Sequence, residues 1–482
     1  MKNEIIRLER VTQIVDGVTL LDQLNLHIFQ GEIMGLVCIN AQGLEALIRL
    51  LCQNVPIHYG YVYFQGNLVN NYEHSSMSVN KVSVIEQRSR LVEDLTVADN
   101  IFVLRRGFKQ YLIHPRILEE QLTRFTEELN IHIDANELVA NLSFFEKCVV
   151  ELLKAVVTGA KLIVIRDISN FISASDLKII HGLLRHYAAQ GVSFLYVCNH
   201  HEEAFKICDH VSLMENGKVR KVLDQTNFHD EIISHYTLDF SRIDSPAIHK
   251  SGKNGILKFE HVFTETIKDM SFTVEKGECV VFLDMNNTAL GDILRLMNNE
   301  MLPLSGKILL DGSDWKENGS RLKKELCFIE ENPIRAMLFQ EMSYLDNLCF
   351  LLDQKRPFLW TNPSIRKSVA QEYEPLIGED IYADDITKLT PFSLYNLIYY
   401  KVHLYHPKVV ICVQPFSGAD MYLRHHLIGL INRLRERKIA VVILAVSVSD
   451  SLVVADRLMV IENGRLCREY HSEEFHFFRT NQ

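Results

Sequence analysis

The sequence has little of what would place the chain in a membrane, in an oxidising compartment or on nucleic acid. Its longest apolar run, Ile439 to Val446, is far shorter than the ~20 residues of a membrane-spanning helix. Its 10 cysteines are scattered without a C-x-x-C pair, which favours a reducing compartment over a disulfide framework. Its formal net charge of −10 argues against a nucleic-acid-binding surface, because phosphate backbones are bound by clustered Lys and Arg.

The start of the chain and its composition predict a soluble globular protein. Every apolar stretch between Met1 and Val11 is interrupted by a charged residue, so the segment lacks the core of a signal peptide. Apolar residues make up 47% and charged residues 23% of the 482 residues, a balance typical of well-packed domains. We therefore expect a cytoplasmic protein of two large domains that reaches the inner face of the cell membrane only peripherally, through a partner.

Three segments of the first half recur in the second half at nearly one spacing. The stretch "DHVSLMENGKV" from Asp209 matches "DRLMVIENGRL" from Asp456, 247 residues later. The stretch "GEIMGLV" from Gly31 matches "GECVVFL" from Gly277, 246 residues later, and "NLSFFEK" and "KLTPFSL" are again 247 apart. This self-similarity predicts a tandem repeat.

Each half alternates buried-type strands with helical patterns. Continuous apolar runs such as "KLIVI" and "KVVIC" are followed by segments of helical spacing such as "ASDLKIIHGLLRHYAAQ", which indicates a mainly parallel sheet covered on both faces. The stretch "DSPAIHKSGKNG" is too polar to bury a core and predicts a linker. We therefore expect an α/β fold with domains at residues 1–243 and 256–482, joined by residues 244–255.

Several further segments carry a resemblance to a known family. These are "LVEDLTVADNIFV" from Leu91, "LNIHIDANELVANLS" from Leu129, and in the second half "LSGKILLDG", "LFQEMSYLDNL" and "QPFSGAD". Over nearly its whole length the chain resembles the tandem ATP-binding-cassette (ABC) subunit of ribose- and galactose-type carbohydrate importers. The resemblance implies two P-loop-NTPase-like domains, each with a mainly parallel sheet, flanking helices, an antiparallel β subdomain and a helical subdomain.

The phosphate loops depart from the family pattern. Such a loop needs glycines whose backbone N–H groups surround the phosphates, a Lys to neutralise them, and a Ser or Thr to hold Mg²⁺. In the first half only Asn40 and Gly43 fit, while Leu44 stands at the lysine position and Glu45 at the hydroxyl position. In the second half Asp284 and Asn287 stand at glycine positions and Leu290 at the lysine position. Neither loop carries the residue that grips a phosphate.

The other catalytic positions are replaced as well. The family's metal-binding Asp and water-polarising Glu correspond to Arg166 and Asp167 in the first half and to Val413 and Gln414 in the second. The signature glycines are absent from "LSFF" and "LTPF". The degenerate catalytic positions are Leu44, Arg166, Asp167, Asn199, Leu290, Val413, Gln414 and Val446, where Asn199 and Val446 stand for the switch histidine. We predict an ABC-type ATPase by resemblance whose hydrolysis is lost.

We expect ATP and Mg²⁺, the family's cofactors, to bind weakly or not at all. Losing the lysine contacts alone costs roughly 1.5–3 kcal/mol each. A weak nucleotide site, if one exists, would consist of Asn40, Gly43, Glu45 and Gln87. Since helix N-termini attract anions, we expect Glu45 to occupy the vacated anion site. We expect no metal site, because the paired histidines lack further ligands at zinc spacing.

The best-preserved region implies docking on a membrane permease. In the family, the segment after the Q-loop forms the groove for the permease's cytoplasmic coupling helix, and here it follows Gln87. The residues predicted to dock are Gln87, Glu93, Asp94, Thr96 and, in the second half, Glu331, near Phe339. The apolar members Leu95, Val97 and Ile101 fit a buried helix start equally well.

Two functions remain open at this stage. The chain is either a permease-docked ABC subunit of a carbohydrate import system with degenerate sites, or a pseudo-ATPase regulator or scaffold that binds a permease-like or sensor membrane protein without transport. A translation factor of tandem-cassette architecture is disfavoured, because the linker is short and only mildly charged. No Ser-His-Asp, Cys-His or paired-carboxylate arrangement indicates an unrelated enzyme.

Overall fold

The computed structural model describes residues 3–75, 77–103, 119–120, 133–199, 201–228, 255–355, 362–446 and 451–475. The chain divides into two compact units, Met1–Leu238 with Asp420–Tyr422, and Asp239–Ala419 with Leu423–Gln482. Apart from residue 255, the linker expected at 244–255 lies outside the described residues. Within the described ranges, no helix has the length and apolar character needed to cross a membrane.

The first unit contains two sheets in its described part. The antiparallel sheet has the strand order β2-β1-β4-β5 and the larger, mainly parallel sheet the order β10-β9-β3-β8-β7-β6. The strands are β1 (Glu4–Val15), β2 (Val18–Phe29), β3 (Ile33–Cys38), β4 (Tyr59–Phe64), β5 (Asn67–Asn71), β6 (Val82–Ile85), β7 (Leu162–Arg166), β8 (Ser193–Cys198), β9 (His210–Glu215) and β10 (Lys218–Asp224). The helices are α1 (Leu44–Cys52), α3 (Phe144–Val157), α4 (Ala174–Ala189) and α5 (His201–Ile207).

The second unit repeats this plan. Its sheets have the orders β12-β11-β14-β15 and β16-β17-β18-β13-β19-β20. The strands are β11 (Leu257–Phe263), β12 (Met270–Val274), β13 (Cys279–Asp284), β14 (Ser305–Leu310), β15 (Ser313–Asp314), β16 (Leu326–Ile329), β17 (Val409–Val413), β18 (Ala440–Ala445), β19 (Arg457–Glu462) and β20 (Arg465–His471). The helices are α7 (Leu290–Met297), α8 (Trp315–Leu322), α9 (Pro333–Met337), α10 (Tyr344–Cys349), α11 (Leu352–Lys355), α12 (Pro363–Ile377), α13 (Pro391–Tyr405), α14 (Met421–Glu436) and α15 (Ser451–Val454).

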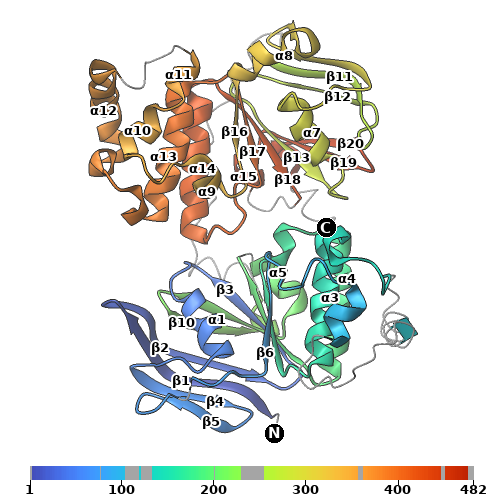
Figure 1. The fold of residues 1–482 in the computed structure, drawn as a ribbon, viewed down its shortest axis with the longest axis vertical. Coiled ribbons are helices and arrows are strands. Elements are labelled where there is room, and N and C mark those ends of the chain that lie inside the picture. Colours follow the sequence, from blue (N-terminus) through green and yellow to red (C-terminus); the bar gives the residue numbers. More distant parts are fainter. Residues whose placement is uncertain are drawn as a thin grey trace. The chain divides into compact units, whose positions relative to one another are not determined.

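The parallel strands are mostly apolar because helices or a second sheet cover both of their faces. Along β7, Ile163 and Ile165 belong to the core shared with α3 and α4, whereas Leu162 and Val164 belong to the core shared with α1 and the antiparallel sheet. Figure 1 shows α1 on one side of this sheet and α3, α4 and α5 on the other. The predicted α/β class, with antiparallel and helical subdomains, is confirmed.

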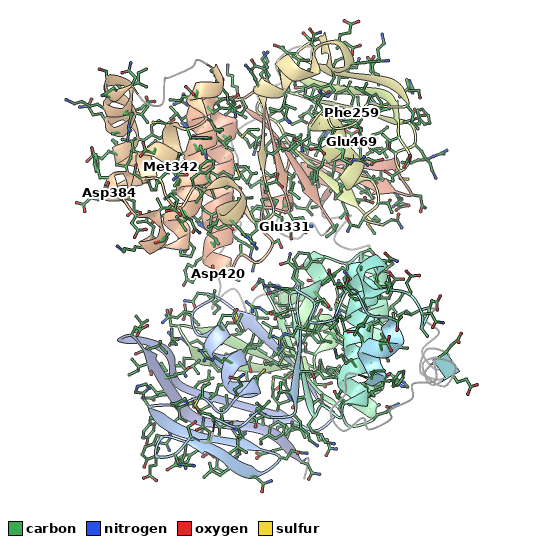
Figure 2. The ribbon with its side chains drawn as sticks, viewed as in Figure 1. Phe259, Glu331, Met342, Asp384, Asp420 and Glu469 are labelled. Carbon is green, nitrogen blue, oxygen red and sulfur yellow. The ribbon has the colours of Figure 1, made fainter. Side chains whose placement is uncertain are left out.

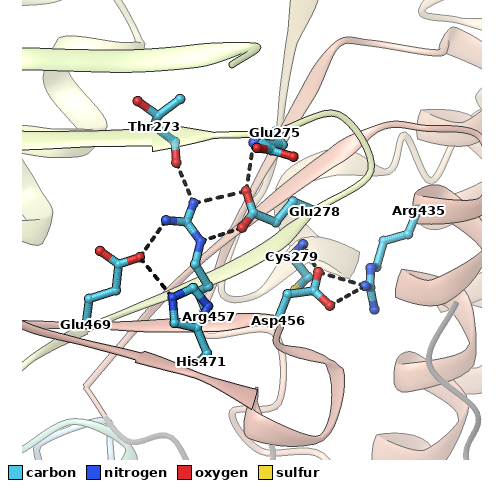
Figure 3. A network of polar contacts seen from close by, with 9 residues as sticks. All are labelled: Thr273, Glu275, Glu278, Cys279, Arg435, Asp456, Arg457, Glu469 and His471. Atoms are coloured by element: carbon cyan, nitrogen blue, oxygen red, sulfur yellow. Dashed lines mark hydrogen bonds and ion pairs between the residues drawn. The ribbon is translucent and has the colours of Figure 1, made fainter. Parts of the chain in front are cut away.

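Two arginines form ion pairs around the start of β19 in the second unit (Figure 3). Arg435 of α14 donates to both oxygens of Asp456 at 2.7 Å, with side chains only 1% and 7% exposed. Arg457 of β19 donates to Glu278, to Glu469 at 2.7 Å and to the carbonyl oxygen of Thr273. These contacts fix β12, β13 and β20 around the start of β19, so the sheet that carries the phosphate-loop position is rigidly supported.

Candidate functional site

Leu44 and Leu290, the residues predicted to stand at the lysine positions of the two phosphate loops, are core residues. Leu44 opens α1 and is 6% exposed within the core beneath the antiparallel sheet. Leu290 opens α7 and is 7% exposed in the corresponding core of the second unit. Each side chain therefore packs inward, and its contribution is to hold the helix start against the sheet.

Asn40 and Gly43, the two residues that fit the family's loop, have structural roles within the fold. The Asn40 side chain donates to Asn216 Oδ1 at 2.6 Å and accepts from the Asn216 backbone N–H at 2.9 Å. Gly43 has φ +84°, and a Cβ at this position would lie 2.3 Å from the carbonyl oxygen of Leu20. The loop is thus tied to the β9–β10 turn and packed against β2, and these contacts alone account for both residue types.

A cationic side chain lies at the metal-ligand position of the first unit. Arg166 ends β7, is a quarter exposed and forms an ion pair with Glu45 in the first turn of α1. Its guanidinium nitrogens also lie 3.7 Å from Glu86 Oε2 and 3.7 Å from Asp167 Oδ2. The expectation that Glu45 occupies the anion site of the loop is wrong, because its carboxylate pairs with Arg166 and no side chain caps α1.

In the second unit, a carboxylate of the chain itself, that of Asp284, lies at the N-terminus of α7. Asp284 is fully buried and accepts from the backbone N–H groups of Ala289 at 2.6 Å, Asn286 at 3.2 Å and Leu290 at 3.3 Å. Donors at a helix N-terminus are those that a phosphate loop offers to its ligand. At the matching position of the first unit stands Cys38, whose thiol pKa burial raises to about 12.

The residues that directly follow β7 and β17 share an unusual backbone conformation. Asp167 and Gln414 have φ of 48° and 43°, in the left-handed region, and each N–H donates to the neighbouring strand, to Val197 at 3.0 Å and Leu444 at 2.9 Å. Asp167 stands beside Arg166, whereas Val413 next to Gln414 is half-buried. At the switch-histidine positions Asn199 is half-buried and Val446 is 4% exposed.

The hydroxyl residues of the two signature positions cap helices. Ser143 accepts from the Glu146 backbone N–H and forms a capping box with its side chain at the start of α3. Thr390 accepts from the Ser393 backbone N–H at the start of α13. Since phenylalanine or proline follows in place of glycine, these positions serve helix initiation.

The segment predicted to dock is closed by the same pair of hydrogen bonds in both units. We call residues 91–103 the first docking segment and residues 338–350 the second. Asn100 is fully buried, accepts from the Val92 N–H at 2.9 Å and donates to the Val92 carbonyl at 3.0 Å. Asn347 makes the same pair of bonds with Phe339, at 2.9 Å each. One buried amide therefore closes each loop on itself.

This shape leaves the turn residues exposed. Val92 and Phe339 occupy equivalent positions and are 44% and 43% exposed. Glu93 and Asp94 beside Val92 are exposed too, and Lys147 lies 3.7 Å from Glu93. The predicted docking residue Gln87 is also exposed.

Other members of the segment are engaged within the fold. Thr96 donates to Asp99 Oδ2 at 2.9 Å and accepts its N–H, as a helix cap does. Val97 and Ile101 are fully buried core residues. Glu331, labelled with Met342 in Figure 2, is half-buried and accepts from Ser417, and burial raises the pKa of its carboxyl.

Known proteins are similar in sequence to this chain over most of its length. Residues 21–167 match the family model described as "ABC transporter". The chain is built of two tandem ABC domains. It is 24% identical over 490 residues to "Ribose import ATP-binding protein RbsA" of Clostridium perfringens (strain 13 / Type A), covering 98% of this chain and 96% of that protein.

Further similar proteins have related names. The chain is 22% identical over 484 residues to "Galactose/methyl galactoside import ATP-binding protein MglA" of Treponema denticola, covering 98% of this chain and 97% of that protein. A solved structure titled "Structure of cbiO1 from clostridium perfringens: Part of the ABC transporter complex cbiONQ" is 17% identical with a TM-score of 0.42, covering 47% of this chain and 92% of that one.

Sequence reasoning missed two features of these ABC domains. The capture of the α7 N-terminus by Asp284 was not predicted, although an Asp that ends an apolar strand six residues before the first residue of a helix is a usable signal. The ion pair between Glu45 and Arg166 was not predicted either, because the two residues are far apart in the sequence. Both features place charges of the chain at positions that the resemblance predicts to belong to nucleotide sites.

Proposed function

We propose that the chain is the ABC subunit of a carbohydrate import system, docking on a membrane permease without hydrolysing ATP. The observation that carries this proposal is the charge at the two nucleotide positions: Arg166 pairs with Glu45 in the first unit, and Asp284 binds the helix N–H groups in the second. The relatives named for ribose and galactose import span nearly the whole chain and support the transport context.

The residues at these positions do not fit a Mg²⁺-bound nucleotide. A guanidinium group at the metal-ligand position repels a divalent cation, and its partner Glu45 would face the terminal phosphate. In the second unit, the Asp284 carboxylate already accepts the N–H groups that would bind phosphate. The buried leucines leave neither loop with a compensating positive charge. Nucleotide binding is therefore weak or absent, and no hydrolytic step is assigned to this chain.

The docking segments support a retained binding role. Both repeats keep the buried asparagine, the capping hydroxyl residue and an exposed apolar residue, Val92 or Phe339, at the turn. Protein interfaces have an apolar core surrounded by a polar rim, so an exposed apolar residue flanked by charged ones fits a binding surface. The proposed docking surface of the first unit therefore consists of Gln87 and Val92 to Asp94.

A scaffold or sensor role without transport is the second candidate. It is favoured because charged residues of the chain itself occupy both predicted nucleotide positions. A transporter whose ABC subunits were all copies of this chain would have no site for ATP. Solute uptake by cells that carry the chain and its permease distinguishes the two. Uptake that requires the chain supports the import role, whereas permease binding without any effect on uptake supports the scaffold.

The docking role is tested with the full-length chain and the carbohydrate permease of its own organism, co-expressed and purified through a tag on the permease. Glu93→Arg reverses an exposed charge at the centre of the proposed surface, and we expect at least a tenfold loss of co-purified chain. Glu73→Arg, an exposed change in the β5–β6 loop, is the matched control and should have no effect. Equal recovery of the Glu93→Arg and wild-type chains would overturn the docking role.

A further inference from the structure

Arg166 lies within a row of ionic contacts formed by Glu45, Arg166, Glu86 and Arg90. The row leads from the predicted nucleotide position to the loop before the first docking segment. On one side it pairs with Glu45 in the first turn of α1. On the other side its Nη1 lies 3.7 Å from Glu86 Oε2, directly after β6. A guanidinium group has five N–H donors in a planar fork and can serve two carboxylates at once. One cation thus connects the phosphate-loop helix with the end of the edge strand.

The row continues from Glu86 to the first docking segment. Glu86 Oε1 accepts from Arg90 Nη2 at 2.9 Å. The backbone N–H of Arg90 donates in turn to Glu151 Oε1 of α3 at 2.6 Å, and Ser89 Oγ donates to the same oxygen at 3.0 Å. Glu151 is 8% exposed, so these bonds are shielded from water. Residues 86–90, which lead into the docking segment, are therefore held from both ends by charge.

The second unit holds its docking segment in a different way. The residues matching Arg166 and Glu45 are Val413 and Gly291, which cannot form an ion pair. There Lys401 of α13, which is 3% exposed, donates to the Met337 carbonyl at 3.0 Å and lies 5.4 Å above the ring of Phe339. An ion pair like that of Arg166 with Glu45 therefore cannot form between the matching residues of the second unit, which provides an internal comparison.

We propose that Arg166 is a positioning residue that holds the first docking segment in its binding conformation, in place of a bound nucleotide and metal ion. This rests on the proposed docking function of residues 91–103. The row of contacts Glu45, Arg166, Glu86 and Arg90 sets the path of the loop that enters the segment, and the segment keeps its shape without any exchangeable ligand. The docking surface of the first unit is consequently permanent and independent of nucleotide.

Hydrogen–deuterium exchange on the full-length chain tests this role without a partner. In Arg166→Gln, we expect the backbone amides of residues 89–100 to exchange at least fivefold faster than in the wild type. The amides of residues 338–347 should exchange at an unchanged rate in the same sample, because their supporting cation is Lys401. Arg166→Lys keeps the positive charge and should recover part of the protection from exchange. Gln and Lys are similar in size, so if only the volume of the side chain mattered, the two variants would exchange at the same rate.

Two further variants keep the test decisive. Glu86→Gln breaks the same row from the other side and should give the same exchange pattern, even if Arg166→Gln folds poorly. Arg185→Gln removes an ion pair of the same unit, with Asp209 at 3.5 Å, and should leave residues 89–100 unchanged. Unaltered exchange of residues 89–100 in both Arg166→Gln and Glu86→Gln would overturn the positioning role. That result would leave the docking role itself to be judged by Glu93→Arg.

Discussion

The capture of the α7 N-terminus by Asp284 makes a quantitative prediction about the stability of the second unit. Asp284→Ala removes the acceptor of two buried N–H groups, those of Ala289 at 2.6 Å and Leu290 at 3.3 Å, and of the partly buried Asn286 N–H at 3.2 Å. A bond to a charged group contributes about 1.5–3 kcal/mol, and the two longer bonds add less. The expected loss is about 3 kcal/mol, which lowers the melting temperature of a domain of this size by roughly 6–12 °C.

Differential scanning calorimetry of the full-length chain measures this loss. Asp284→Asn retains an acceptor oxygen and should lose about half as much. Asp311→Ala is the control in the same unit, because its ion pair with Lys408, at 2.8 Å, is exposed and contributes only about 0.2–1 kcal/mol. A melting temperature for Asp284→Ala within 1 °C of the Asp311→Ala value would refute the argument.

An added anion gives a second readout for the same variant. If Asp284→Ala vacates an anion position at a helix N-terminus, inorganic phosphate should stabilise this variant more than the wild type. With a Kd of about 10 mM, 50 mM phosphate would add about 1 kcal/mol. An equal phosphate effect on the two proteins would mean that Asp284 does not occupy a phosphate position.

Two further predictions concern buried charges of the second unit. Asp456→Ala leaves the 1% exposed Arg435 without its carboxylate and should lower the free energy of unfolding by about 3–5 kcal/mol; a urea titration showing a loss below 1 kcal/mol would contradict this. Burial lowers the pKa of Lys401 to about 8. Between pH 8 and 10.5 the unfolded chain therefore binds more protons at this residue than the folded chain does. The free energy of unfolding should then rise with pH by up to about 3 kcal/mol relative to Lys401→Met. Urea titrations of both proteins at pH 7.5, 9 and 10.5 check the sign, and a constant difference would show that Lys401 does not titrate in this range.

The fold could be predicted from the sequence because its signals are local and repeated. The apolar run of β18 predicts a strand and the apolar spacing of α4 predicts a helix, each without reference to the rest of the chain. The repeat at 246–247 residues shows the same order of elements twice. The prediction that the catalytic positions are replaced rests on the same repetition, since Leu44 and Leu290 occupy matching places in two copies.

The partners of the site residues could not be predicted, because they depend on the folded path of the chain. A carboxylate at position 45 has a favourable helix N-terminus nearby, yet the Arg166 guanidinium at the end of β7 attracts it more strongly, since a full charge outweighs the partial charge of a helix end. Asn40 is predicted from the sequence as a ligand residue, and its two bonds to Asn216 could not be predicted in the same way. Thr96 fits docking and capping equally in sequence, and its bonds to Asp99 are those of a cap.

The most direct test of the account is Mg²⁺-dependent phosphate release from ATP by the purified full-length chain, measured with and without its permease. Because Arg166 stands at the metal-ligand position and Asp284 fills the second loop, we predict a rate equal to the buffer background in both cases. A rate above background that is abolished by Asp167→Ala or Gln414→Ala would show that a nucleotide site works in this chain, and would contradict the account.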